Sequence, residues 1–66
     1  MHYEDRILKF LEENKNREFS VKELSKETGI SYTTTLKWVE VLFAKGLIKM
    51  RDYGNIKLVR FGGNND

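Results

Sequence analysis

The chain has 66 residues, which is enough for one domain and too few for two. Cysteine is absent and His2 is the single histidine, which argues against disulfide bonds and metal sites, so we expect no metal and no other cofactor. The net charge is only +2, and no apolar run approaches the roughly 20 residues of a membrane-spanning helix or forms a signal peptide, which predicts a cytoplasmic protein.

The first predicted element is a helix that ends before the run Asn-Lys-Asn. Its apolar side chains recur at spacings of three and four, at Tyr3, Ile7, Leu8, Phe10 and Leu11. One stripe suits a core, and a second stripe of Tyr3, Ile7 and Phe10 lies beside it. This helix therefore offers more apolar surface than one contact requires.

The second helix is predicted to begin at Ser20, after a short extended link over residues 17–19. The spacing of Ser20 and Glu23 is that of a capping box, in which each side chain bonds the other residue's backbone amide. Gly29 is expected to end this helix, because left-handed backbone conformations cost glycine little.

The third helix is expected from about Tyr32 to Lys45, with Ser31 as its N-cap. A β-hairpin over residues 47–61 should follow, because apolar and basic residues alternate from Ile48 to Arg51 and, more loosely, over residues 56–61. The connecting run Asp-Tyr-Gly-Asn has the residue types of a turn.

This order of helix, short strand, helix, helix and two-stranded hairpin resembles the winged helix-turn-helix family of DNA-binding proteins over roughly residues 5–61. The likeness is strongest in Phe-Ser-Val-Lys-Glu-Leu-Ser-Lys-Glu-Thr-Gly-Ile-Ser (residues 19–31) and in Lys-Gly-Leu-Ile-Lys (residues 45–49). It implies an α+β, mainly α fold over residues 1–61, with a disordered tail at 62–66, and the role of a small transcription regulator.

In that family the third helix enters the major groove of double-stranded DNA, and the hairpin, called the wing, follows the DNA backbone or enters the minor groove. The resemblance places groove-facing side chains at Tyr32, Thr33, Leu36, Lys37 and Glu40. The candidate DNA-binding residues are Ser31, Tyr32, Thr33, Thr34, Lys37, Arg51, Asn55 and Lys57. Ser31 and Thr34 have an alternative role as helix caps, and Glu40 as an ordinary exposed glutamate.

The distribution of charge favours the same half of the chain. Residues 1–30 carry six basic and seven acidic side chains, whereas residues 31–61 carry six basic and two acidic ones. A polyanion would therefore meet the second half. Basic residues on a hairpin also protect edge strands against aggregation, and that reading stays open for Arg51 and Lys57.

The remaining apolar residues predict a homodimer. Trp38 and Val41 lie on a face of the third helix that turns away from the predicted DNA contact. The possible dimer interface consists of Tyr3, Ile7, Phe10, Trp38 and Val41. The alternative is that Trp38 packs against the first helix within one chain.

No arrangement of residues suggests catalysis or a small-molecule ligand. Ser20 and Ser31 lack a neighbouring base, and the glutamates lie on exposed helix faces. We therefore expect a DNA-binding protein rather than an enzyme. A protein-interaction module within a larger assembly is the main alternative, and binding of RNA or single strands is a third.

Overall fold

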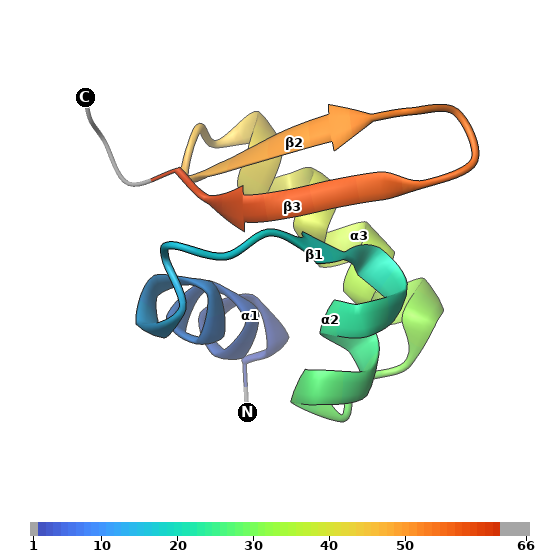
Figure 1. Ribbon diagram of the computed structural model, residues 1–66. Coiled ribbons are helices and arrows are strands. Elements are labelled where there is room, and N and C mark those ends of the chain that lie inside the picture. The colour runs from blue at the N-terminus through green and yellow to red at the C-terminus, as the bar shows by residue number, and fades with distance from the viewer. Residues whose placement is uncertain (1, 63–66) are drawn as a thin grey trace.

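Three helices cover one face of a small antiparallel sheet in the computed structural model, which describes residues 2–62 (Figure 1). The elements in chain order are α1 (Tyr3–Glu13), β1 (Phe19–Ser20), α2 (Val21–Thr28), α3 (Tyr32–Ala44), β2 (Ile48–Asp52) and β3 (Lys57–Phe61). The predicted α+β, mainly α architecture is confirmed, with α3 ending one residue earlier than expected. Most of the predicted tail, residues 63–66, lies outside the described residues.

The sheet has three strands in the order β1-β3-β2, so β3 is paired along both edges. Met50 and Phe19 both lie opposite Val59, one from each neighbouring strand. The sequence predicted an extended link before α2 but not its pairing with β3. The pairing follows from burial: the Phe19 side chain is only 1% exposed, and inserting it into the core brings its backbone alongside β3.

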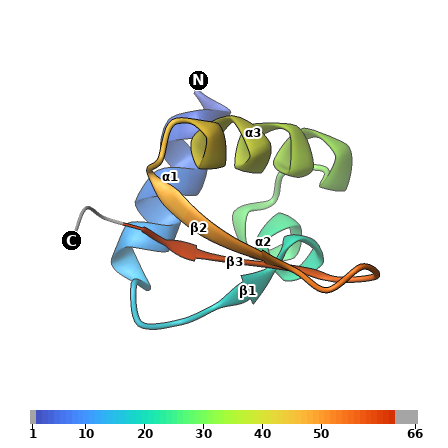
Figure 2. The same cartoon turned by 90° about the horizontal axis from the view of Figure 1, so that it is seen from above.

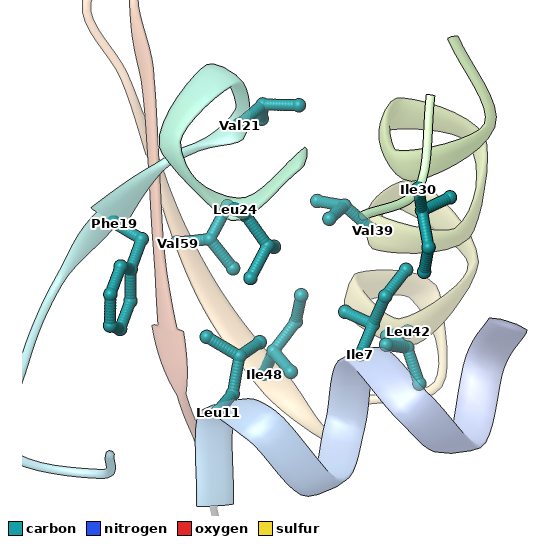
Figure 3. Close-up of a cluster of buried hydrophobic side chains, with 10 residues drawn as sticks. All are labelled: Ile7, Leu11, Phe19, Val21, Leu24, Ile30, Val39, Leu42, Ile48 and Val59. Carbon is teal, nitrogen blue, oxygen red and sulfur yellow. The ribbon is translucent and has the colours of Figure 1, made fainter. Parts of the chain in front are cut away.

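The core lies between the inner face of the sheet and the three helices (Figure 3). It consists of Ile7, Leu11, Phe19, Val21, Leu24, Ile30, Val39, Leu42, Ile48 and Val59. The Phe10 ring packs on the Phe19 ring with a centroid distance of 5.1 Å and so closes one side. Burial of each large side chain contributes about 1.5–3 kcal/mol.

Local capping positions the two helices that precede the hairpin. Both halves of the predicted capping box form: the Glu23 amide donates to the Ser20 hydroxyl at 3.0 Å, and the Ser20 amide donates to the Glu23 carboxylate at 3.1 Å. Gly29 ends α2 in the left-handed region with a φ of 74°. The short connection is then fixed by Ser25 and Thr35, whose hydroxyls both donate to the Ile30 carbonyl.

The register of the hairpin decides which of its side chains face the helices. Because strand side chains alternate between faces, buried Val59 and Ile48 mark the inner face, which Lys57 shares. The opposite, outer face carries Lys49, Arg51, Leu58 and Arg60. Lys57 and Arg51, which the sequence grouped together, therefore lie on different faces of the sheet.

Candidate functional site

The first turn of α3 is open to solvent. Ser31, Tyr32 and Thr33 are exposed, Tyr32 to 51%, and Thr34 is partly buried. The Ser31 hydroxyl accepts from the Thr34 amide at 3.3 Å, so the expected N-cap is present. An uncovered helix N-terminus carries partial positive charge and favours anions.

A groove separates this first turn from the tip of the β2–β3 hairpin. Figure 2 shows both at the same end of the molecule, with α2 between them. The groove has a volume of about 520 Å³ and is lined by Ser20, Val21, Lys22, Tyr32, Gly54, Asn55, Ile56 and Lys57. It therefore brings together three of the predicted DNA-binding residues, which are Tyr32, Asn55 and Lys57.

An acidic residue of α3 reaches across to the hairpin. The Lys57 ammonium lies 3.6 Å from the Glu40 carboxylate, and the two side chains are 32% and 56% exposed. This ion pair gives Glu40 a partner, which the sequence did not predict. It also neutralises one of the cations that had been expected to contact phosphate.

Arg51 lies on the outer face of the sheet, away from the groove. Its guanidinium forms an ion pair with Glu18 at 3.1 Å and donates to the Tyr53 hydroxyl at 3.0 Å. The hydrogen bond to Tyr53, with the charge of Glu18, raises the pKa of Arg51. The structure does not bring this residue together with the other candidates.

No family model matches the chain, and neither does any curated protein. Solved structures do match it. A structure of HOP2, described for its DNA recognition and protein interaction domains, superposes with a TM-score of 0.76 at 29% identity, covering 88% of this chain and 95% of the other. A homodimeric winged helix-turn-helix DNA-binding domain from Mycobacterium bovis, a possible ArsR-family transcriptional regulator, gives 0.73 at 28% identity.

The chain is a winged helix-turn-helix domain. The helix-turn-helix is α2 and α3, and the wing is the β2–β3 hairpin. HlyU from Vibrio cholerae has the same fold, with a TM-score of 0.75 at 23% identity, over 91% of this chain and 65% of that one. The match with the Mycobacterium bovis domain covers 88% of this chain but only 54% of the other.

The tip of the wing is apolar rather than basic. Tyr53 and Ile56 are 54% and 44% exposed. Between them Gly54, with a φ of 89°, donates its amide to the Asp52 carboxylate at 2.8 Å, which holds the turn. The cations that flank the tip, Arg51 and Lys57, both pair with carboxylates instead of extending beyond it.

Lys37 is exposed on α3 and pairs with no carboxylate among residues 2–62. Its ammonium lies 5.3 Å from the centre of the Trp38 ring. A cation–π contact at an exposed site is worth only about 0.5–1 kcal/mol, so it restrains the side chain weakly. Lys37 is therefore available to an anion outside the domain.

The residues of the predicted dimer interface are only partly accessible. Ile7 is fully buried, and its side chain is committed to the core. Phe10 and Trp38 are partly buried and pack on the core, and Val41 is partly buried too. Trp38 also lines a cleft of about 210 Å³ with residues 2–5, beside the start of α1. Tyr3 is 42% exposed.

Other exposed apolar residues were not assigned to a surface from the sequence. Phe43 and Leu47, at the end of α3 and just before β2, are 49% and 39% exposed. Packing within the domain therefore covers both side chains incompletely.

Within residues 2–62, no three His, Cys, Asp or Glu side chains are grouped as metal ligands. None of the helices described is long and apolar enough to cross a membrane.

Proposed function

We propose that this winged helix binds double-stranded DNA, with the first turns of α3 in the major groove and the wing beside them, and that it acts as a small transcription regulator. The observation that carries the proposal is the convergence of the exposed first turn of α3 and the wing tip on one groove. The Mycobacterium bovis domain and HOP2, both associated with DNA by name, support it at the level of the fold.

The chemistry of this surface suits the DNA backbone. Lys22, at the start of α2, lines the groove, and Lys37 extends from α3. The N-terminal ends of both helices add partial positive charge, and the hydroxyls of Ser31 and Thr33 can donate to phosphate oxygens. Such contacts fix the protein on the duplex without reading its sequence.

Sequence readout is expected to involve few bases. Of the residues that the resemblance placed on the DNA-facing side of α3, Leu36 is partly buried against the core and Glu40 is engaged by Lys57. Tyr32, Thr33 and Asn55 remain as groups able to touch base edges. We therefore propose binding dominated by phosphate contacts, with a steep dependence on salt.

A mobility-shift titration with a duplex of random sequence tests the proposal. Wild-type affinity should fall with salt, by about 0.9 log units per log unit of salt for each phosphate contacted. Lys22→Ala and Lys37→Ala should each weaken binding about tenfold at 0.1 M salt and reduce the salt dependence by about one contact.

The matched control is Lys15→Ala. Lys15 is an exposed lysine in the turn after α1, which Figure 1 shows at the opposite side of the molecule from the wing tip. Its loss should leave affinity within about twofold of wild type, which is the range expected for distant surface charges under screening. Equal effects of all three substitutions would contradict the docking mode.

We also propose that the winged helix is a homodimer, as the Mycobacterium bovis domain is by its description. The exposed ring of Tyr3, beside the cleft under Trp38, is the centre of the proposed contact. Sedimentation should give twice the monomer mass, and Tyr3→Glu should give the monomer. Phe43→Glu, at an exposed aromatic residue near the end of α3, is the matched control and should leave the dimer intact.

A protein-interaction module is the second candidate, and the exposed Phe43 and Leu47 favour it. The absence of any mobility shift at tens of micromolar protein and low salt would support this role over DNA binding. If Phe43→Glu rather than Tyr3→Glu dissociates the dimer, the apolar patch at the end of α3 is the self-association surface.

A further inference from the structure

A second cationic surface lies on the side of the sheet opposite the helices. Lys49, Arg51 and Arg60 are exposed there around the partly buried Leu58. We call these four residues the outer sheet face. The helices and the core all lie on the other side of the sheet (Figure 3). Of the eight residues that line the groove, none belongs to the outer sheet face.

Two of its cations are direct neighbours without a compensating acid. Lys49 and Arg60 are cross-strand partners in the β2–β3 ladder. Neither has an ion pair or a side-chain hydrogen bond within residues 2–62, whereas Glu18 pairs with Arg51. Like charges directly opposite each other destabilise a sheet. The chain therefore carries a locally unfavourable pair, which an anionic ligand would relieve.

We propose that the outer sheet face binds the phosphate backbone of a second DNA duplex, so that one winged helix holds two duplexes on different sides. This proposal rests on the proposed binding of a first duplex at the groove. Lys49 and Arg51 are two residues apart on β2, about 6.8 Å along the strand, and Arg60 lies beside them. The three form a compact cationic patch.

The composition of the surface favours nucleic acid over an acidic protein. Protein interfaces have an apolar or aromatic centre that supplies most of the binding energy. The only apolar side chain on the outer sheet face is Leu58, and it is partly buried among its neighbours. Phosphate binding needs cations without an apolar centre, because it is driven by release of counterions.

Protection of the edge strand is the competing role for these cations. β2 is an edge of the sheet, and charged side chains on an edge prevent pairing with other chains. Glutamate also places a charge on the edge strand and so keeps this protection. Lys49→Glu therefore separates the two roles: it preserves edge protection and removes the attraction for phosphate.

A two-duplex capture experiment tests the proposal. A biotinylated duplex on beads is saturated with the full chain and washed, and a fluorescent duplex is then added. The wild-type protein should retain the second duplex. Lys49→Glu should reduce that retention at least fivefold, while the mobility shift of a single duplex at the groove stays within twofold of wild type. Circular dichroism should show that this variant remains folded, because the substitution relieves a repulsion.

A dimer could also join two duplexes, one at the groove of each protomer. Tyr3→Glu controls for this: capture through the outer sheet face persists in the variant, and capture through a dimer does not. Retention of the second duplex by Lys49→Glu at the wild-type level would overturn the proposal, and so would no retention by the wild type. The proposal would also be overturned if the protein bound poly-glutamate in preference to the duplex and this binding depended on Lys49.

Failure of the groove assignment gives a different pattern. In that case Lys37→Ala leaves the single-duplex shift unchanged and Lys49→Glu abolishes it. That result would support DNA binding on the outer sheet face and overturn both the groove as the first site and the simultaneous binding of two duplexes.

Discussion

The first turn of α3 and the wing differ in how far their polar groups are already engaged. Ser31 and Thr33 are exposed on α3, and Lys37 makes only a weak contact with an aromatic ring. In the wing, Lys57 is paired with Glu40 and Arg51 with Glu18. A net count of basic residues treats these two regions alike. Lys37 of α3 has no carboxylate partner in the described chain, whereas the two cations that flank the wing tip are both paired.

This difference changes how much of the affinity for DNA each region is expected to contribute. The wing is tied to α3 by the Glu40–Lys57 pair and ends in an apolar tip at Tyr53 and Ile56. It is suited to shape and apolar contact more than to charge. Affinity should then depend mainly on α3 and the start of α2, which can be tested by substitutions in each region.

Charge reversal at two positions should give the largest contrast. Lys37→Glu should weaken duplex binding by more than about tenfold, because it removes a phosphate contact and adds repulsion. Arg51→Glu should change the binding of a first duplex at the groove by less than about twofold, because Arg51 lies on the outer sheet face. Mobility shifts at 0.1 M salt measure both. A larger loss for Arg51→Glu would show that the wing, not α3, anchors the duplex.

Substitutions at the two N-cap serines should show which of them affects only the stability of the fold and which also affects DNA binding. Ser31→Ala should destabilise the fold by about 1 kcal/mol, and Ser20→Ala by somewhat more because the whole capping box is lost. Ser31→Asp should retain stability, since aspartate caps as well as serine. It should nevertheless weaken DNA binding, because it places a negative charge at the first turn of α3. Thermal unfolding and mobility shifts of these variants make the comparison. Unchanged binding by Ser31→Asp would restrict Ser31 to capping.

The elements of this fold were predictable because their signals are local. Ser20 with Glu23, and Gly29 alone, determine where α2 begins and ends within a few residues of sequence. The pairing of Phe19 with Val59 was not predictable in this way, because it joins residues 40 positions apart.

The candidate site could be predicted only in part, for the same reason. The sequence identified the first turn of α3, which depends on local capping. It could not assign faces to Arg51 and Lys57, because a shift of the register by one residue exchanges the two faces of a strand. Nor could it reveal the partners of these cations, Glu18 and Glu40, which come from other elements.

Removal of the Glu40 carboxylate should make the wing more similar to α3, because a cation of the wing then has no carboxylate partner. Glu40→Gln frees Lys57 to contact phosphate and removes a negative charge beside the groove. Duplex binding should tighten about threefold. The slope of log affinity against log salt should steepen by up to the value expected for one additional phosphate contact. The fold should lose less than about 1 kcal/mol, as for other exposed ion pairs. If Glu40 accepts a hydrogen bond from a base, affinity for the preferred duplex would fall instead.

The smallest change in the free energy of unfolding is expected on the outer sheet face, where Lys49 and Arg60 repel each other across β2 and β3. Lys49→Glu replaces a repulsive cross-strand pair with an attractive one opposite Arg60, and should stabilise the fold by roughly 0.2–1 kcal/mol. For a domain of this size that corresponds to a rise in melting temperature of up to about 8 °C. Arg60→Glu should also stabilise the fold when Lys49 is present, and should stabilise it less when Lys49 has been replaced by glutamate. In the double variant two like charges face each other again, so the two effects should fail to add. Strict additivity in thermal unfolding would mean that Lys49 and Arg60 do not interact, and the unfavourable pair on which the second DNA site depends would not exist.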